Sequence, residues 1–334
     1  MKSLTSYQDH SVALVESDAP LLGDGEVLLA PILTGICGTD LEIIHGKIDP
    51  AYVTYPIVLG HEWCGRIVDV GDVITELAVG DRVVCEGIIP CGTCFECTSG
   101  NSNRCTTYDE IGFTRPGAAA ELIKAPARLL HKIADNVSDE SAALVEPTAV
   151  VTQGILKAAP KDGSKVLVIG DGTIAMIAAR LIRNWNPSSV KMLGLKAGQV
   201  ELANKAGVDE FLTATPFEKY DLIIEASGSS TRISEAVGLL VRGGKLLLLG
   251  FTGSDVTTGI SIDDVVNGDL SILASFGYTR EAWKATVALL NSGALDLSFL
   301  VTHRFALSSY AEAITALESA PAPRGKIALE NRIS

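Results

Sequence analysis

Four cysteines lie close together in the sequence, at Cys91, Cys94, Cys97 and Cys105, in a C-x2-C-x2-C-x7-C pattern. This spacing is too tight for a network of disulfides, and it suits four thiolates around one tetrahedral zinc ion. A zinc ion closed off by four thiolates has no position left for a substrate. The pattern therefore predicts a structural zinc lobe, over about residues 86–110.

A second group of metal-binding residue types lies upstream, in the segments Cys37-Gly38-Thr39-Asp40 and Gly60-His61-Glu62. A catalytic zinc site needs three protein ligands and one open position for the substrate oxygen. Zinc lowers the pKa of bound water to about 7, and we expect it to acidify an alcohol similarly. The hydroxyl of Thr39 can accept the alcohol proton and pass it on, whereas we expect Asp40 to orient the loop.

A glycine-rich segment, Gly170-Asp171-Gly172-Thr173-Ile174-Ala175, follows an apolar run and precedes a helical pattern. In this context a dinucleotide-binding fingerprint is informative. The two glycines let the backbone turn and approach a pyrophosphate at the helix N-terminus, and Ala175 can replace the third glycine. We therefore expect Gly170, Gly172, Thr173 and Ile174 to bind the cofactor.

The second strand of such a unit normally ends in a carboxylate that binds the ribose 2′-hydroxyl of NAD. Here no Asp or Glu occurs from Gly172 to Val200, and the strand tip is Gly194-Leu195-Lys196, with Lys191 nearby. A carboxylate about 4 Å from a phosphate charge would cost about 4 kcal/mol at an effective dielectric of 20. Gly194 leaves room and Lys196 supplies attraction, which predicts a preference for NADP(H). The alternative is a solvated Lys196 with poor selectivity.

The bulk composition is that of a globular protein of 334 residues, 47% hydrophobic, which is long enough for two domains. No window approaches 18 consecutive apolar residues, and the N-terminus lacks a secretion signal, so we expect a cytoplasmic protein without a membrane span. A net charge of -13 with no stripe of Lys and Arg argues against nucleic-acid binding. Small molecules are the expected partners.

The pattern of apolar residues changes along the chain. From Glu26 to about Lys132 it predicts a β-rich, loop-heavy domain. A capping-type start near Ser138 precedes an Ala-rich helical stretch, which Pro147 would kink or restart. Beyond it, strands alternate with helices, as in a parallel, doubly wound sheet. The predicted strands span residues 165–169, 190–195, 221–226, 245–250 and 271–276, and an amphipathic helix carries Trp283, Val287 and Leu290.

Together these motifs resemble the zinc-dependent medium-chain alcohol dehydrogenase family, in its sorbitol/polyol and threonine dehydrogenase-like branch. The Cys-Gly-Thr-Asp segment, Gly-His-Glu, the four-cysteine lobe, Glu146-Pro147 and the glycine-rich loop occur in that family's order. The resemblance implies an α/β protein with a GroES-like catalytic domain over residues 1–146 and 277–334. A Rossmann dinucleotide-binding domain, a doubly wound parallel sheet, would cover residues 147–276.

The resemblance also implies a role for individual residues. Cys37 and His61 would bind the catalytic zinc, with Glu146 as the third ligand, where other members use cysteine. Glu62 would be a second carboxylate that reaches the metal directly or through water, so the choice between the two carboxylates stays open. The cysteine lobe would hold a second zinc ion. The resemblance further suggests a homodimer or homotetramer.

Three positions depart from the family pattern. Glu42 stands where many members have a relay histidine, with His45 three residues further on, so either of the two is a candidate for proton transfer. Gly277 replaces an arginine of sorbitol dehydrogenases, which weakens the case for sorbitol itself. Ala119 stands where an aromatic residue is common, which would either widen the pocket or only alter packing.

The expected activity is hydride transfer between NADP(H) and a secondary alcohol, on a polyol, a cyclitol or a sugar derivative. One alternative is an amino alcohol, such as threonine or an aminocyclitol, because carboxylates at Glu42, Glu62 and Glu146 would accept an ammonium group. Another is a noncatalytic NADPH-binding relative. The intact set of Cys37, Thr39, His61 and Glu146 argues against that reading.

Overall fold

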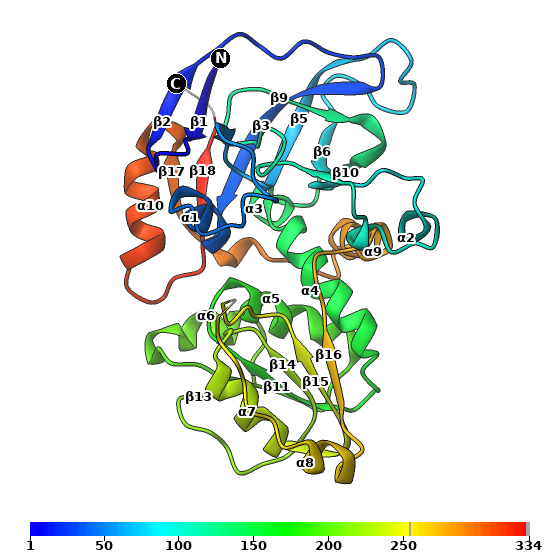
Figure 1. The fold of residues 1–334 in the computed structure, drawn as a ribbon, viewed down its shortest axis with the longest axis vertical. Coiled ribbons are helices and arrows are strands. Elements are labelled where there is room, and N and C mark those ends of the chain that lie inside the picture. Colours follow the sequence, from blue (N-terminus) through cyan, green and yellow to red (C-terminus); the bar gives the residue numbers. More distant parts are fainter. Residues whose placement is uncertain (254, 332–334) are drawn as a thin grey trace. The chain divides into compact units, whose positions relative to one another are not determined.

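The computed structural model describes residues 1–331 apart from residue 254, and the chain forms two compact units (Figure 1). The first contains Met1–Glu146, Thr279–Ala320 and the segment from Lys326 onward, and the second contains Pro147–Tyr278 and Pro321–Gly325. The predicted domain boundaries lay after residues 146 and 276. The short return of residues 321–325 to the second unit had not been predicted.

The first unit is built on a seven-stranded sheet that joins distant parts of the sequence. The last strand, β18 (Lys326–Glu330), pairs antiparallel with β3 (Glu26–Ile36) and parallel with β17 (Val301–Ala306), so the C-terminal segment becomes part of the N-terminal sheet. The strand order is β10 (Leu130–Lys132), β6 (Arg82–Cys85), β5 (Glu62–Val70), β3 (Glu26–Ile36), β18 (Lys326–Glu330) and β17 (Val301–Ala306), with β9 (Ile123–Pro126) also on β3.

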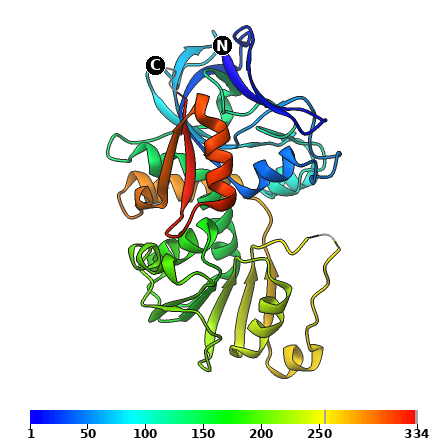
Figure 2. The ribbon, with the colours of Figure 1, turned by 90° about the vertical axis from the view of Figure 1, so that its left-hand side faces the viewer.

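Smaller elements complete this unit. Helix α10 (Tyr310–Ser319) packs on β17 and β18 (Figure 2). The buried side chains of α9 (Arg280–Asn291) include Trp283, Val287 and Leu290, as the amphipathic pattern predicted. The other elements are a sheet of β2 (Val12–Glu16), β1 (Lys2–Ser6) and β4 (Ile57–Val58), a ribbon of β7 (Ile88–Ile89) and β8 (Asp109–Glu110), and the helices α1 (Gly38–Ile44), α2 (Phe95–Thr98), α3 (Asp139–Ala143) and α9 (Arg280–Asn291).

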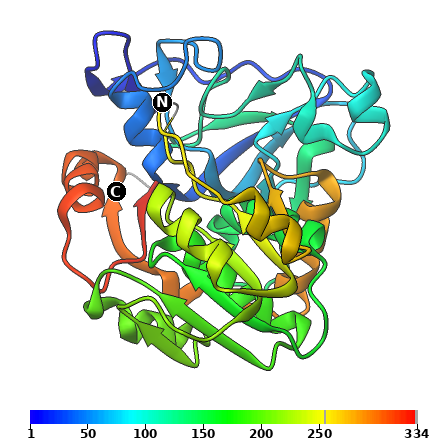
Figure 3. The same ribbon diagram turned by 60° about the horizontal axis from the view of Figure 1, so that its bottom comes forward.

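The second unit contains a six-stranded parallel sheet, which confirms the predicted α/β class (Figure 3). Its chain order, third-second-first-fourth-fifth-sixth, is that of a Rossmann fold. Right-handed connections therefore place α5 and α6 on one face and α7 and α8 on the other. The strands are β13 (Glu210–Leu212), β12 (Ser189–Leu193), β11 (Lys165–Ile169), β14 (Tyr220–Glu225), β15 (Leu240–Leu248) and β16 (Ser271–Ala274), and the helices are α5 (Thr173–Ile182), α6 (Val200–Lys205), α7 (Ser230–Gly238) and α8 (Ile262–Asn267).

The helix break near the unit boundary differs from the expected one. Helix α3 ends at Ala143 and α4 (Val145–Ala158) begins two residues before Pro147, so the chain restarts ahead of the proline. Proline is tolerated in the first turn of a helix because the amides there have no partner within the helix. Glu146 consequently lies in the first turn of α4.

Candidate active site

Three of the predicted metal ligands come together in the first unit. The ligand atoms of Cys37, His61 and Glu62 all lie within 4.8 Å of one another. Cys37 caps α1, where its sulfur accepts a hydrogen bond from the amide of Thr39 at 3.2 Å, and it lies 3.2 Å from Nε2 of His61. His61 and Glu62 are buried, at 7% and 3% exposure. The cluster therefore presents one sulfur, one nitrogen and one oxygen donor.

Asp40 contacts both Cys37 and His61 and fixes their positions in this cluster. Its Oδ2 accepts a hydrogen bond from the Cys37 amide at 2.9 Å, and its Oδ1 faces Nδ1 of His61 at 3.5 Å. Burial would raise the pKa of Asp40, but the nearby His61 keeps it below the usual range. A carboxylate on Nδ1 fixes the imidazole so that Nε2 points to the metal position. The expected orienting role of Asp40 has a structural basis.

A buried lysine, which the sequence analysis missed, pairs with Glu62. Lys326 Nζ lies 2.5 Å from Glu62 Oε2, and both side chains are almost fully buried. Burial would lower the pKa of Lys326, but Glu62 and then Cys37 raise it. The two side chains meet over Gly35 on the intervening strand, where an added Cβ would lie 2.6 Å from Glu62 Oε2. The only signal in the sequence was a lysine at the start of an apolar strand.

Glu146 lies in the electrostatic surroundings of this cluster, although it is not among the three residues whose donor atoms meet. Burial raises the pKa of Glu146 to about 8, with His61 opposing this shift and Glu62 and Glu110 adding to it. Burial also raises the pKa of Glu110 to about 7, against the lowering effect of His61. The carboxylates of Glu62, Glu110 and Glu146 therefore belong to the electrostatic surroundings of His61 in addition to Asp40, and a cation would stabilise their charged forms.

The donor set fits zinc. Zinc binds thiolate, imidazole and carboxylate at about 2.0–2.3 Å, which requires donors a few ångströms apart, as these are. Asp40 Oδ1 and Glu62 Oε2 are compensated by ion pairs with His61 Nδ1 and Lys326, whereas Cys37 Sγ and His61 Nε2 face each other at 3.2 Å as two metal-binding donors. Cys37, His61 and a carboxylate from Glu62 or Glu146 are the residues that would hold the metal.

The four cysteines of the lobe also meet. Their sulfurs lie within 4.8 Å of one another, with Cys91 and Cys97 3.8 Å apart and Cys94 and Cys105 4.0 Å apart. Zinc–sulfur bonds of 2.3 Å in a tetrahedron place sulfurs about 3.8 Å apart. Hydrogen bonds from the backbone of Thr93 and Cys94 lower the pKa of Cys91 to about 5, which favours the thiolate that binds metal. The geometry suits a structural zinc ion.

The glycine-rich loop of the second unit forms an open helix N-terminus. Gly170 has φ +119°, and an added Cβ there would lie 3.1 Å from the backbone of Ala226 at the end of β14. Gly172 is the N-cap of α5 and provides no side chain to its first amides. Such amides bind phosphate groups, at the point where the strand order of the sheet reverses.

A carboxylate from the glycine-rich loop, Asp171, lies at the strand tip, although the sequence analysis assigned no role to this residue. Asp171 Oδ2 accepts hydrogen bonds from the amides of Leu195 and Lys196, both at 2.8 Å. An added Cβ on Gly194 would lie 2.5 Å from the Phe211 ring and 2.8 Å from Asp171 Cβ. Gly194 is therefore required by this packing. Lys191 forms ion pairs with Glu210 and Glu218, whereas Lys196 is exposed.

The candidates for proton transfer lie on α1. Thr39 follows Cys37 in the first turn, and among the described residues its hydroxyl has no hydrogen-bond partner, so it can meet a substrate. Glu42 and His45 are exposed. A direct hydrogen-bonded route from Thr39 to either of them is absent from the described part of the chain.

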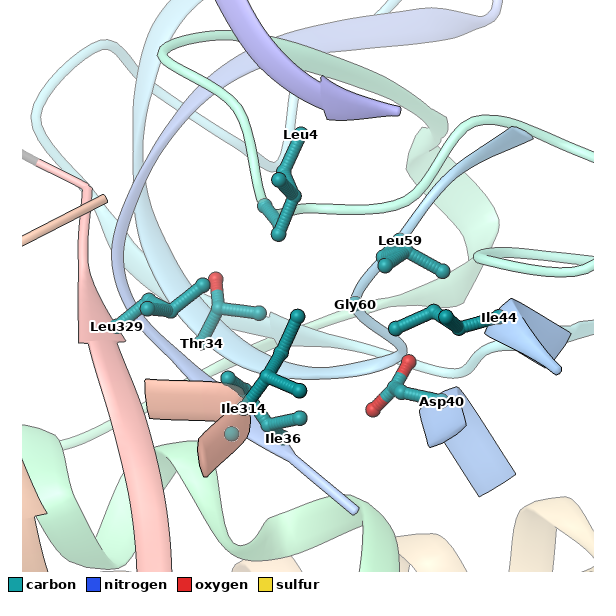
Figure 4. A pocket seen from close by; sticks show the side chains of 11 residues that line it. Leu4, Thr34, Ile36, Asp40, Ile44, Leu59, Gly60, Ile314 and Leu329 are labelled. Atoms are coloured by element: carbon teal, nitrogen blue, oxygen red, sulfur yellow. The ribbon is translucent and has the colours of Figure 1, made fainter. Parts of the chain in front are cut away.

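A small cavity lies beside the cluster but is not the substrate site (Figure 4). Its volume of about 10 Å³ is close to the least that holds one water. Leu4, Leu59 and Ile314 line it, and so does Asp40. Ala119 also lines this cavity and is 1% exposed, so its small size serves packing in the core.

Comparison with known proteins agrees with this geometry. Residues 23–135 match the alcohol dehydrogenase GroES-like domain, and residues 172–292 match the zinc-binding dehydrogenase family. Among the residues that the structure describes, no helix combines the length and apolar character needed to cross a bilayer.

Relatives match over nearly the whole chain. An L-threonine 3-dehydrogenase of Aeromonas hydrophila is 31% identical, over 98% of this chain and 99% of its own. D-arabinitol dehydrogenase 1 of Uromyces fabae is 29% identical, over 96% and 94%. The structure of a zinc-binding dehydrogenase from Sinorhizobium meliloti 1021, bound to NADP, superposes on this chain with a TM-score of 0.92. The two sequences are 25% identical, and the superposition covers 98% of each chain. The chain belongs to the zinc-dependent medium-chain alcohol dehydrogenase family.

Replacing a lobe cysteine should remove one metal ion without touching the other. For Cys97→Ser we expect the zinc content, measured by atomic emission on the purified protein, to fall from two ions per chain to one, with a lower Tm. Losing a structural zinc removes folding free energy. The matched control is Cys64→Ser, because Cys64 is buried outside the lobe and should keep both ions. Unchanged zinc in Cys97→Ser would contradict the assignment.

Adding one methyl group under the Lys326–Glu62 pair should disturb the catalytic cluster. Gly35→Ala places a Cβ 2.6 Å from Glu62 Oε2, and we expect the free energy of unfolding to fall by about 1–3 kcal/mol. Denaturant titration measures it. Gly25→Ala is the control, because nothing lies within 4 Å of its added Cβ. Equal stability of the two variants would show that the pair does not depend on the space at Gly35.

Proposed function

We propose that this enzyme oxidises a secondary hydroxyl of a polyol, cyclitol or sugar derivative with NADP, or reduces the corresponding ketone. The observation that carries the proposal is the cluster of Cys37, His61 and Glu62, with the Thr39 hydroxyl beside it, in a chain that also has a Rossmann unit. A relative named D-arabinitol dehydrogenase 1 supports the polyol class.

Bound zinc would supply Lewis acidity, and the nicotinamide would accept the hydride. The side chains of the protein orient the metal ligands and transfer the proton. Asp40 orients His61, and Lys326 fixes the Glu62 carboxylate. Thr39 accepts the hydroxyl proton of the substrate as the carbon loses its hydride, so the alcohol becomes a ketone. Glu42 and His45, exposed on the same helix, are the proposed groups that pass this proton to water.

The preference for NADP(H) rests on two features of the strand tip. Gly194 provides no carboxylate, and the exposed Lys196 offers a positive charge to a 2′-phosphate. Asp171 opposes this, because its carboxylate lies beside Gly194, although one of its oxygens is engaged by two backbone amides. We propose that the attraction between Lys196 and the 2′-phosphate is stronger than the repulsion by Asp171, so that NADP(H) is preferred.

An amino alcohol is the second candidate substrate. A relative named L-threonine 3-dehydrogenase is 31% identical, and Glu62, Glu110 and Glu146 gather near His61. Gly277 stands where sorbitol dehydrogenases have an arginine, which weakens the case for sorbitol itself. The φ of +55° at Gly277 is a conformation that favours glycine.

We further propose a homodimer or homotetramer in the cytoplasm.

Steady-state rates on matched substrates test the proposed reaction. With polyols, cyclitols and amino alcohols, and with NADP and NAD side by side, we expect an NADP-linked rate on one hydroxyl class. Absence of any rate from the zinc-loaded protein would contradict it. Lys196→Ala should lower the ratio of NADP to NAD efficiency by about fivefold, because an exposed charge pair is worth up to about 1 kcal/mol and about 1.4 kcal/mol is a factor of ten. Asp171→Asn should raise the ratio. Lys191→Ala, whose lysine is already paired, should leave the ratio unchanged.

Removing the Thr39 hydroxyl should slow the chemical step. For Thr39→Ala we expect kcat to fall by about 10²–10⁴, the usual contribution of a positioned proton acceptor, whereas Thr39→Ser should retain most of it. Stopped-flow measurement of reduced-cofactor formation gives these rates, and zinc content should be equal in both variants. If Thr39→Ser is as slow as Thr39→Ala, the methyl group and not the hydroxyl is what matters.

A further inference from the structure

The short segment of residues 321–325 returns to the second unit, and a buried glutamine holds it there. Gln199, the N-cap residue of α6, is only 3% exposed. Its Oε1 accepts a hydrogen bond from the amide of Arg324 at 2.8 Å, and its Nε2 donates to the carbonyl of Arg324 at 2.8 Å. The side-chain amide of Gln199 therefore pairs with the backbone of the return segment as one peptide group pairs with another.

The same side chain also binds the glycine-rich loop. Gln199 Nε2 donates a further hydrogen bond to the carbonyl of Asp171, again at 2.8 Å. Both hydrogens of the amide and its oxygen are thus engaged, as a buried polar group requires. Gln199 consequently joins two segments that are distant in the sequence, the return segment and the loop between Gly170 and Gly172.

The carbonyl of Asp171 lies in the same peptide plane as the amide of Gly172. A trans peptide is planar, so its C=O and N–H groups point in opposite directions. Holding the Asp171 carbonyl on Gln199 therefore also fixes the direction of the Gly172 amide. Gly172 is the N-cap residue of α5, and the amides at this helix end are the groups that would bind the pyrophosphate of a dinucleotide.

The loop needs such support because glycines flank Asp171 on both sides. Glycine loses more conformational freedom on ordering than any other residue. The hydrogen bonds from the amides of Leu195 and Lys196 fix only the carboxylate of Asp171, whereas Gln199 fixes its backbone. A loop that is ordered before the ligand arrives binds it more tightly, because less entropy is lost on binding.

We propose that Gln199 is a positioning residue for the cofactor, which holds the glycine-rich loop in the conformation that receives the pyrophosphate. Since Gln199 is buried and its amide is fully engaged, it acts through the loop. This inference rests on the nicotinamide-dependent reaction of the proposed function and extends it to a residue outside the fingerprint. NAD and NADP share the pyrophosphate, so the role of Gln199 is independent of the preference between them.

Gln199→Met tests this role, because methionine has a similar length and makes none of the three hydrogen bonds. We expect the Kd of the zinc-loaded protein for NADPH and for NADH, measured by titration calorimetry, to rise about tenfold in both cases. Gln199→Glu should raise both values further, because its carboxylate cannot donate to the carbonyls of Asp171 and Arg324. At saturating cofactor, kcat should stay within about threefold of the wild type, since the lost interaction serves binding.

Asn291 provides a matched control in the first unit. Its side-chain amide also pairs with backbone groups, donating to the carbonyl of Lys132 at 3.1 Å and accepting from the amide of Ala134 at 2.9 Å. Asn291→Leu should lower the Tm as Gln199→Met does, because each loses hydrogen bonds to the backbone. Unlike Gln199→Met, it should leave the Kd for both cofactors unchanged.

Two results would overturn the role of Gln199. The first is a Gln199→Met variant with a lower Tm and wild-type Kd values for both cofactors, which would make the residue purely structural. The second is a rise in Kd for NADPH alone, which would place the effect at the 2′-phosphate and not at the pyrophosphate. A wild type that binds both cofactors but oxidises no alcohol would instead refute the proposed reaction, and the same titrations would still decide the role of Gln199.

Discussion

The buried pair of Lys326 and Glu62 ties the active site to the end of the chain. Removing one partner of such a pair costs about 3–5 kcal/mol, because the other charge stays buried, even though the intact pair adds little net stability. The pair forms only if β5, β3 and β18 are neighbours in register, with Gly35 opposite Glu62 and Ile36 opposite Ile327. The C-terminal strand is consequently part of the catalytic unit, although it carries no metal ligand.

The charges around His61 are compensated unequally. Asp40 is balanced by the amide of Cys37 and by His61, and Glu62 by Lys326. Cys37 lies 3.2 Å from Nε2 of His61, whereas the carboxylates of Glu110 and Glu146 form no ion pair among the residues that the structure describes. Burial raises the pKa of both glutamates, and the charges of Glu62 and Glu110 add to the shift at Glu146. A divalent metal ion would stabilise the charged forms of these carboxylates.

The parts of the site that the sequence predicted lie within short segments. Cys37 with Thr39, His61 with Glu62, and the four lobe cysteines carry recognisable spacing, because each group belongs to one turn or one strand end. Lys326 escaped prediction because its pairing with Glu62 joins residues that are distant in the sequence. Strand β13, with three residues, is too short to show a pattern. Asp171 was visible within the glycine-rich loop, but the fingerprint constrains only the residues around it.

Asp171 also bears on the predicted preference for NADP(H). The absence of a carboxylate at Gly194 predicts space for a phosphate, yet the Phe211 ring and Asp171 fill the space beside Gly194, and Asp171 brings a carboxylate to the same strand tip. Its hydrogen bonds to the amides of Leu195 and Lys196 also fix the backbone that carries the Lys196 side chain. A negative and a positive group are therefore held together by one set of contacts. In the proposed NADP complex, cofactor selectivity would depend on the balance of these two charges at the ribose, and a sequence pattern that records only the missing acid cannot express that balance.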